Sequence, residues 1–175
     1  TLPAGGVELA GTVADIAGGP ISHAQLRAGE AVAESDDAGK FSLWVDPGST
    51  YVQATADGYA PSSWSGEAPG RPELQLTPES SLSGTVVMES GEPLADAQVE
   101  IAGLDWRQSS VDTTSGDDGT FHADRLSPGR YAITVRSAHA YGTSAGTVLV
   151  ALAEHTDGIV IEVVPAAEVT GRITT

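Results

Sequence analysis

The sequence predicts an all-β protein built from two small tandem modules, with the start of a third. Three observations lead to this fold class. Short motifs occur twice in the same order, so the repeat must be read before any single element. Apolar and polar residues alternate in short segments that Gly, Pro, Asp and Ser separate, which is typical of strands and turns. No window has apolar residues at helical spacing with good caps.

The repeat sets the predicted domain boundaries, because a length of 175 residues alone would suggest one domain or slightly more. Its motifs are Gly11-Thr12-Val13 with Gly84-Thr85-Val86, Ala24-Gln25-Leu26 with Ala97-Gln98-Val99, and Pro47-Gly48 with Pro128-Gly129. Residues 36–39 align with residues 115–119, a string one residue longer. Gly171-Arg172-Ile173 begins the pattern again. We expect a first repeat at 1–78, a second at 79–166, and the start of a third repeat or a linker at 167–175.

Strands are expected wherever the period of two is clear. In the segment 40–45, this period directs Phe41, Leu43 and Val45 to the core and Trp44 to the outer face. Strands are expected in the first repeat at 7–14, 24–28, 40–45, 52–56 and 73–77, and in the second at 81–88, 97–102, 120–123, 131–135 and 159–164. The Pro/Gly/Ser-rich segment 60–72 and the insertions at 100–115 and 138–157 are expected to be loops, where module-specific function most often lies.

Composition excludes several function classes. The formal net charge is −16, which repels phosphate backbones and anionic lipids, so we expect no nucleic-acid partner. The chain has no cysteine, which excludes thiolate metal sites and disulfides. No apolar run approaches the roughly 20 residues that span a bilayer, so no membrane insertion is expected. The first residue is Thr1, and we expect the chain to be a piece of a longer protein.

The ordered motifs resemble a known family. The run Gly11-Thr12-Val13, Gly19-Pro20-Ile21, residues 36–41, Pro47-Gly48 and residues 58–61 is similar to the carboxypeptidase regulatory-like domain. That family belongs with the prealbumin-like (transthyretin-like) domains and the collagen-adhesin B-type repeats. The second repeat matches at most of these motifs and departs at Gly58-Tyr59, where Ala140-Tyr141 is a loose counterpart. The resemblance implies two tandem Greek-key β-sandwiches of about seven strands each.

The resemblance also implies a function without catalysis. Such modules act as spacers, stability elements or interaction domains in larger secreted or surface proteins, many of them bacterial. We therefore expect a structural or interaction segment whose partner is another protein or a neighbouring repeat, located outside the cell, in the periplasm or on the cell surface. The alternative is a carbohydrate-binding module that stacks a polysaccharide on loop tryptophans.

Four residues in the predicted loops are candidate binding residues. Trp64, Trp106 and Tyr141 have aromatic rings that could stack on sugars or anchor a protein partner, and Arg107 lies beside Trp106. The competing interpretation is that the tryptophans cover the edge of a module or fill a junction.

Paired aspartates are candidate metal ligands. Asp36 and Asp37 in the first repeat, with Asp117 and Asp118 in the second, could supply oxygens to calcium, and no other cofactor is expected. We favour structural turns, because Asp-Gly and Asp-X-Gly form turns and the spacing does not match a complete calcium loop.

No catalytic constellation is found in the sequence. There is no Gly-X-Ser-X-Gly elbow, and carboxylates such as Glu89 and Glu92 flank a turn. The four histidines are far apart in sequence and are interpreted as surface residues, so zinc is not expected. We expect no enzyme activity.

Overall fold

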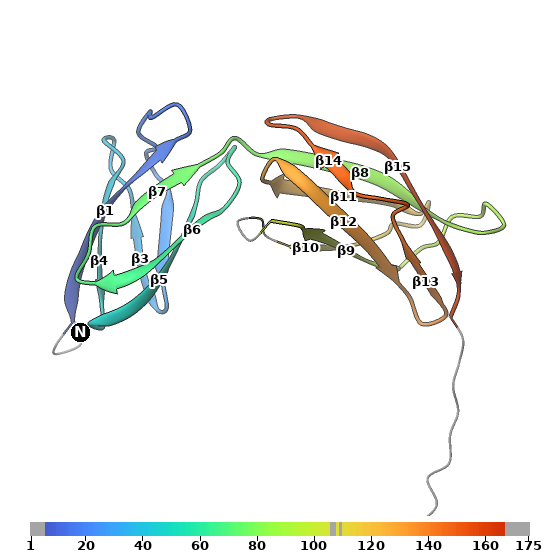
Figure 1. The fold of residues 1–175 in the computed structure, drawn as a ribbon, viewed down its shortest axis with the longest axis horizontal. Helices are drawn as coiled ribbons and strands as arrows, with labels where there is room; N and C mark the ends of the chain where they lie inside the picture. Colours follow the sequence, from blue (N-terminus) through green and yellow to red (C-terminus); the bar gives the residue numbers. More distant parts are fainter. Residues whose placement is uncertain (1–5, 106–107, 109, 167–175) are drawn as a thin grey trace, which may run out of the picture. The chain divides into compact units, whose positions relative to one another are not determined.

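The computed structural model describes residues 6–105, 108 and 110–166. The chain forms two compact units. Unit 1 comprises residues 1–80 with 125–128, and unit 2 comprises residues 81–124 with 129–175. The regular elements of the described residues are all strands (Figure 1). None of these residues forms a helix long and apolar enough to span a bilayer. The predicted boundaries at residues 78 and 166 stay predictions, and the expected third repeat lies outside the described residues.

Unit 1 is a sandwich of two sheets. Its strands are β1 (Val7–Asp15), β2 (Gln25–Ala28), β3 (Ala31–Glu34), β4 (Lys40–Val45), β5 (Gly48–Thr55), β6 (Ser62–Ala68) and β7 (Glu73–Leu76). One sheet has the order β4-β1-β7 and the other β3-β2-β5-β6. The chain therefore passes from one sheet to the other after β1, β3, β4 and β6.

Unit 2 repeats this strand order. Its strands are β8 (Ser80–Met88), β9 (Gln98–Gly103), β10 (Val111–Thr114), β11 (Thr120–Leu126), β12 (Gly129–Arg136), β13 (Ala140–Thr143), β14 (Val148–Val150) and β15 (His155–Pro165). The order β10-β9-β12-β13-β15-β8-β11 contains the counterparts of both sheets of unit 1. Two differences are visible: β13 also pairs with β15, which joins the sheets at one side, and the additional strand β14 pairs with β12.

Apolar side chains alternate with polar ones along the strands and point into the cores of both units, as predicted. On β4, Phe41, Leu43 and Val45 are at most 8% exposed, whereas Trp44 between them is 50% exposed. Tyr131, Ile133 and Val135 alternate inward on β12 in the same way, each 0% exposed. The main buried positions of unit 1 are Leu9, Val13, Leu26, Phe41, Leu43, Val52, Leu74 and Leu76. Those of unit 2 are Leu82, Val86, Val99, Ile101, Phe121, Tyr131, Ile133, Val135, Ile161 and Val163.

A geometry common to the two units explains the glycine of the repeated Gly-Thr-Val motif. A Cβ on Gly11 would lie 2.2 Å from the Pro72 carbonyl oxygen and 2.8 Å from the Phe41 ring. A Cβ on Gly84 would lie 2.4 Å from the Ile159 carbonyl oxygen and 2.6 Å from the Phe121 ring. The glycine therefore lets the first strand come close to an aromatic ring and to a backbone carbonyl, which lies just before the last strand in unit 1 and within it in unit 2.

All three loop predictions are wrong in part, because strands occur in each segment. The insertion at 100–115 contains the end of β9 and the whole of β10. The segment 60–72 contains β6, which pairs with β5 from Gly48↔Ala68 to Ala54↔Ser62. The insertion at 138–157 contains β13 and β14. Ser and Gly have low strand propensity, but backbone pairing with the long neighbouring strand compensates for it. The tyrosines of the two equivalent strands differ: Tyr131 on β12 is buried, whereas Tyr51 on β5 points outward and is 56% exposed.

Candidate functional site

Trp64 lies on strand β6, and its side chain covers part of the sheet of unit 1 to which it belongs. The side chain is half-buried and packs against the core of unit 1. A Cβ on Gly66 would lie 2.3 Å from the Trp64 ring, so the indole lies directly over this glycine, two residues along the same face. Gly70 also faces the ring, at 3.6 Å for an added Cβ. An indole in this position protects backbone at the edge of the sheet. This agrees with the interpretation that the tryptophan covers a module edge.

Tyr141, another aromatic candidate, belongs to unit 2, whereas Trp64 belongs to unit 1. Tyr141 lies on β13 of unit 2, pairs with Arg136 and Val164 on the neighbouring strands, and is 45% exposed. Trp106 and Arg107 lie outside the described residues. A binding role for Trp64, Tyr141, Trp106 or Arg107 stays a prediction.

The aspartate pairs lie in equivalent turns. In unit 1, Asp36 Oδ1 accepts hydrogen bonds from the backbone N–H groups of Ala38 (2.9 Å) and Lys40 (2.8 Å). The Asp36 N–H donates to the Lys40 carbonyl, and the Gly39 N–H donates to the Asp36 carbonyl. These bonds close a turn between β3 and β4, as the turn interpretation expects.

The turn in unit 2 is built with a different aspartate. Gly116 stands where Asp36 stands in unit 1. Its N–H donates to the Thr120 carbonyl, and its carbonyl accepts from the Gly119 N–H. Asp118 instead accepts from the Thr120 N–H (3.0 Å) and hydroxyl (2.6 Å). The Thr120 hydroxyl bond is the main reason why the pKa of Asp118 is lowered. Residues 36–39 therefore match residues 116–119 without a length difference, which corrects the predicted alignment. Asp36 and Asp118 are not equivalent positions.

Asp37 and Asp117 are equivalent and exposed. Among the described residues, no group of three or more His, Asp or Glu side chains is arranged to hold a metal ion. Calcium binding at Asp36, Asp37, Asp117 and Asp118 stays a prediction.

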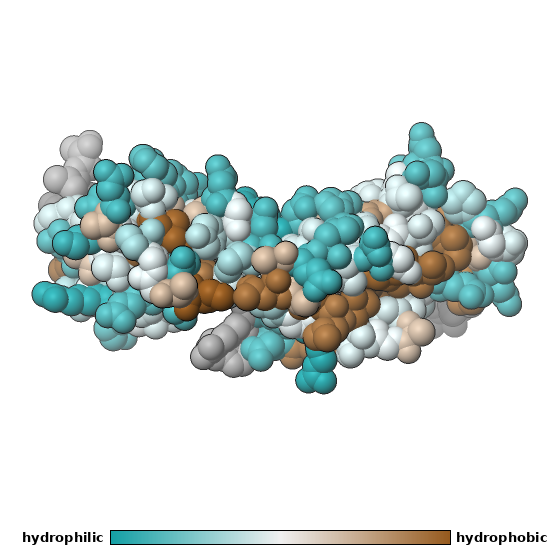
Figure 2. All heavy atoms as spheres, turned by 90° about the horizontal axis from the view of Figure 1, so that it is seen from above, coloured by the Kyte–Doolittle hydropathy of each residue, from teal (hydrophilic) through white to brown (hydrophobic). Residues whose placement is uncertain are grey.

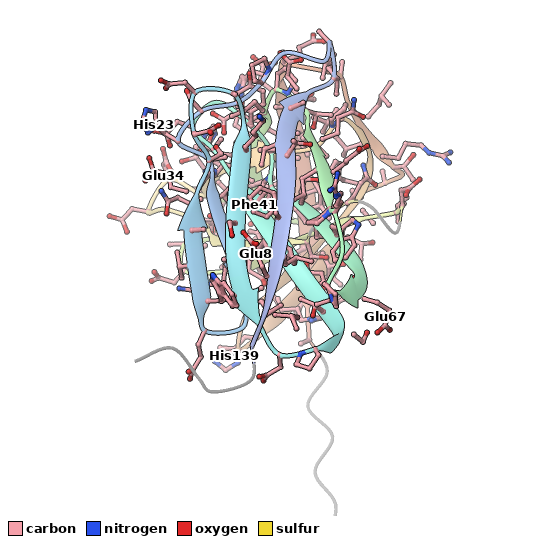
Figure 3. All side chains as sticks on the ribbon, turned by 90° about the vertical axis from the view of Figure 1, so that its left-hand side faces the viewer. Glu8, His23, Glu34, Phe41, Glu67 and His139 are labelled. Atoms are coloured by element: carbon pink, nitrogen blue, oxygen red, sulfur yellow. The ribbon has the colours of Figure 1, made fainter. Side chains whose placement is uncertain are left out.

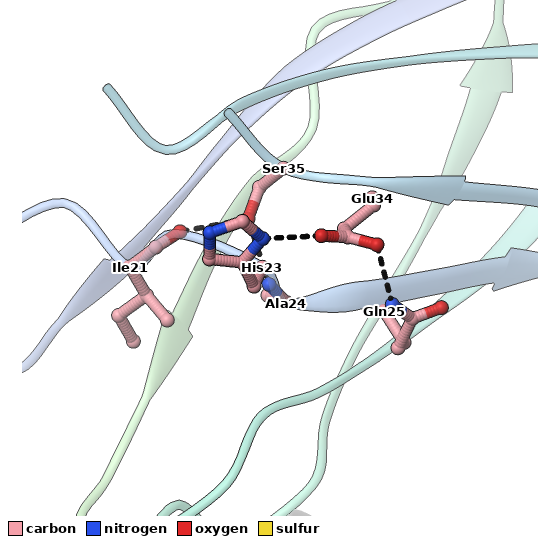
Figure 4. Close-up of polar contacts among 6 residues, drawn as sticks. All are labelled: Ile21, His23, Ala24, Gln25, Glu34 and Ser35. Carbon is pink, nitrogen blue, oxygen red and sulfur yellow. Dashed lines mark hydrogen bonds and ion pairs between the residues drawn. The ribbon is translucent and has the colours of Figure 1, made fainter. Parts of the chain in front are cut away.

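Sequence reasoning missed a pair of buried serines, Ser35 and Ser115, beside these turns. Ser35 Oγ accepts from the Ala24 N–H (2.9 Å) and donates to the Ile21 carbonyl (2.7 Å) (Figure 4). Each of the two serines is 3% exposed. The signal was present in the sequence, because Ser35 and Ser115 stand at the same place in the correct alignment of the repeats.

An exposed ion pair lies next to Ser35. His23 Nδ1 contacts the Glu34 carboxylate, whose other oxygen accepts from Gln25 Nε2 at 3.0 Å (Figure 4). Figure 3 shows His23 and Glu34 at the outside of unit 1, away from Phe41 in the core. The hydrogen bond to Glu34 raises the pKa of His23, and the bond from His23 lowers the pKa of Glu34. The pair ties the turn before β2 to the end of β3.

A second polar cluster lies on the outer face of unit 2. Ser81 Oγ is 2.8 Å from His155 Nδ1, and Ser83 Oγ is 3.0 Å from His155 Nε2. The rings of His155 and His122 have centroids 5.7 Å apart. The spacing of the histidines in the sequence does not predict this pair. Residues 122 and 155 are far apart in sequence, but β11 and β15 both flank β8.

Large apolar side chains are also exposed. Figure 2 shows one face of the molecule, on which apolar residues lie among mostly hydrophilic ones. In unit 2 the exposed members include Tyr141, Leu149, Leu152, Val160 and Val164. Tyr141 and Val164 are direct partners in the β13–β15 pair, so two of them lie together.

Comparison with solved structures finds low-identity matches. The minor pilin of Streptococcus agalactiae is 13% identical, with a TM-score of 0.46, covering 95% of this chain and 99% of that one. The Bacillus anthracis TIE protein is 14% identical, with a TM-score of 0.43, over 92% of this chain, which spans only 34% of the TIE protein. The shaft pilin SpaA of Lactobacillus rhamnosus GG is 10% identical, with a TM-score of 0.42, over 94% and 100% of the two chains.

Comparison with curated proteins gives no match. The family comparison is decisive, because the model of the carboxypeptidase regulatory-like domain matches residues 81–170, which is more than half of the chain. The strands β8 to β15, which fall in the matched region, have the strand order that unit 1 repeats. The chain belongs to the carboxypeptidase regulatory-like domain family.

Proposed function

We propose that the chain is a non-catalytic structural segment of a larger secreted or cell-surface protein, in which it acts as a spacer that transmits force or as a segment that binds other proteins. Membership of the family supports this proposal. The interior supports it as well, because the buried polar residues among those described are Ser35, Ser80 and Ser115. Ser35 and Ser115 hold backbone turns, which is a structural task.

The observation that carries the proposal is the pairing of the first and last strands of each unit. In unit 1, β1 and β7 are parallel neighbours, from Thr12↔Glu73 to Asp15↔Leu76. In unit 2, β8 and β15 are parallel neighbours over a longer stretch, from His155↔Ser81 to Val163↔Met88. Because the two strands point the same way, the chain enters each unit at one end of the pair and leaves at the other.

This pairing determines how each unit responds to tension. A pull on the two ends of the chain slides the first strand along the last, so that the hydrogen bonds between them are loaded together rather than broken one after another. Each bond contributes about 0.5–1.5 kcal/mol, but the set must fail as a group before the core opens. A unit that carries tension in this way is suited to a spacer in a surface protein.

The protein-interaction part of the proposal depends on the surface of unit 2. Its exposed apolar side chains include Leu149 and Val160, which are 68% and 63% exposed. Edge strands such as β10 have unpaired backbone groups that another strand could use. Neither feature identifies a partner, so the spacer is the function that we put forward first.

Single-molecule force spectroscopy of the whole chain tests the proposal. With the chain held at its two ends, we expect two discrete unfolding events. Each should release the extended length of the unit less its folded span. The extended length is roughly 25–30 nm, given the 70 residues from Val7 to Leu76 and the 86 from Ser80 to Pro165 at about 3.5 Å per residue. Smooth extension without discrete events would contradict the proposal.

A further inference from the structure

We propose that His122 and His155 form a binding site for one divalent transition-metal ion on the outer face of unit 2. This inference goes beyond the structural function proposed above and does not depend on it. The two ring centroids are 5.7 Å apart, with an angle of 38° between the ring planes. Two imidazoles on one tetrahedral ion, with metal–nitrogen distances of about 2.0–2.1 Å, place their centroids roughly 5 Å apart. A small change in side-chain torsion would bring both rings onto a common ion.

The topology explains why the rings meet. The order β15-β8-β11 places β8 between the two strands that carry the histidines. His155 is the register partner of Ser81 on β8. The β8 side chains on this face are the small Ser81 and Ser83, so the rings can approach each other above the middle strand.

The neighbours of His122 fit a metal ligand. Its Nε2 is 2.7 Å from Asp124 Oδ1, and an ionised carboxylate only accepts hydrogen bonds. Nε2 of a neutral ring therefore carries the hydrogen, which leaves the lone pair of Nδ1 for a metal. A ligating histidine typically donates its other N–H to a carboxylate, which fixes the tautomer and makes the ring a better ligand. Asp124 would act in this supporting position.

The neighbours of His155 fit as well. One ring nitrogen can donate to a serine hydroxyl while the other accepts from the second serine, at 2.8 Å for Ser81 and 3.0 Å for Ser83. A metal ion would take the place of one serine hydroxyl at its ring nitrogen, and the other serine would keep its hydrogen bond and hold the His155 ring in position. The described residues offer no arranged set of three or more ligands, so water would complete the coordination. Imidazole nitrogen favours Cu²⁺, Ni²⁺ and Zn²⁺ over Ca²⁺ and Mg²⁺.

The test uses the whole chain, prepared without a polyhistidine tag, and Cu²⁺ as the probe. We expect one equivalent of Cu²⁺ to bind. The electron paramagnetic resonance spectrum of the bound Cu²⁺ should show two coupled imidazole nitrogens. His122→Gln and His155→Gln should each weaken binding at least tenfold and reduce the spectrum to one nitrogen. His139→Gln and His23→Gln are matched controls and should change neither result. Asp124→Asn should weaken binding about tenfold while both nitrogens remain, because it removes only the support of His122.

Circular dichroism of each variant checks that it folds. A second measurement is independent of copper and uses Zn²⁺ in the presence of excess Ca²⁺. Zn²⁺ should shift the imidazole NMR signals of His122 and His155 together and leave those of the other two histidines unchanged. Binding that survives both glutamine variants, or a shift spread over all four histidines, would show association with the acidic surface and would overturn the proposal.

Discussion

Ser115 in unit 2 makes the same two backbone hydrogen bonds that Ser35 makes in unit 1. Ser115 Oγ accepts from the Ala97 N–H at 3.0 Å and donates to the Leu94 carbonyl at 2.7 Å. Ser35 makes these bonds with Ala24 and Ile21. In both units the serine connects the segment before the second strand (β2 or β9) to the turn that leads into the fourth strand (β4 or β11). The two units therefore share a buried polar contact as well as the same pattern of apolar core residues.

Replacing either serine by alanine should destabilise only its own unit. Ser35→Ala removes the acceptor of the Ala24 N–H and the donor to the Ile21 carbonyl in a buried setting. Leaving such groups unsatisfied costs about 1–3 kcal/mol. Amide hydrogen exchange, read separately for the two units, should show this loss in unit 1 for Ser35→Ala and in unit 2 for Ser115→Ala. Ser63→Ala, on β6, is the control and should stay within about 0.5 kcal/mol.

Gly39 should tolerate a side chain much less well than Gly29. Both have positive φ, +70° and +57°. A Cβ on Gly39 would lie 2.3 Å from the Val13 carbonyl oxygen, whereas a Cβ on Gly29 meets nothing within 4 Å. Gly29→Ala should therefore cost about 1–2 kcal/mol for the left-handed backbone alone. Gly39→Ala should cost clearly more, measured as the free energy of unfolding in urea; equal losses would mean that the contact with Val13 relaxes freely.

Trp64 should act in stability rather than in sugar binding. Trp64→Ala removes a half-buried ring from the core of unit 1 and uncovers Gly66, so we expect a loss of about 1–3 kcal/mol, below the range for a fully buried tryptophan. Trp44→Ala, on the outer face of β4, is the matched control and should cost less than about 1 kcal/mol. A glycan array should give no hit that either substitution removes. A glycan that binds the native chain and is lost in folded Trp64→Ala would restore the carbohydrate-binding alternative.

The His23–Glu34 pair should titrate as a coupled exposed pair. Its hydrogen bond raises the pKa of His23 above the ordinary 6.5 and lowers that of Glu34 below the ordinary 4.5. The contribution of His23 to stability is complete below pH 6.5 and is lost as the pH rises through its raised pKa. The contribution of Glu34 is complete above pH 4.5 and is lost as the pH falls through its lowered pKa. The pair therefore stabilises fully between pH 4.5 and 6.5.

NMR titration of the imidazole protons tests this pair. In Glu34→Gln the midpoint of His23 should fall toward 6.5. An unchanged His23 midpoint would mean that the two side chains do not interact in solution.

The sequence predicted the parts of the fold that depend on local pattern. Alternation identified the inward residues Phe41, Leu43 and Val45, and repeated Asp and Gly residues identified the turns. It did not predict β6, because Ser and Gly have little intrinsic strand preference and the strand depends on pairing with β5. Features that depend on strand order were also missed. The His122–His155 contact requires knowing that β8 separates their strands.

The direction of pulling tests the central claim of a force-transmitting unit most directly. The chain has no native cysteine, so introduced cysteines give unique handles. Handles at Glu8→Cys and Trp44→Cys, exposed register partners on the antiparallel strands β1 and β4, would peel these strands apart one bond at a time. Handles at the two ends of the chain load β1 against β7 in shear. We predict a clearly higher unfolding force for unit 1 through the chain ends than through residues 8 and 44. Equal forces in the two directions, or a lower force through the ends, would contradict the account.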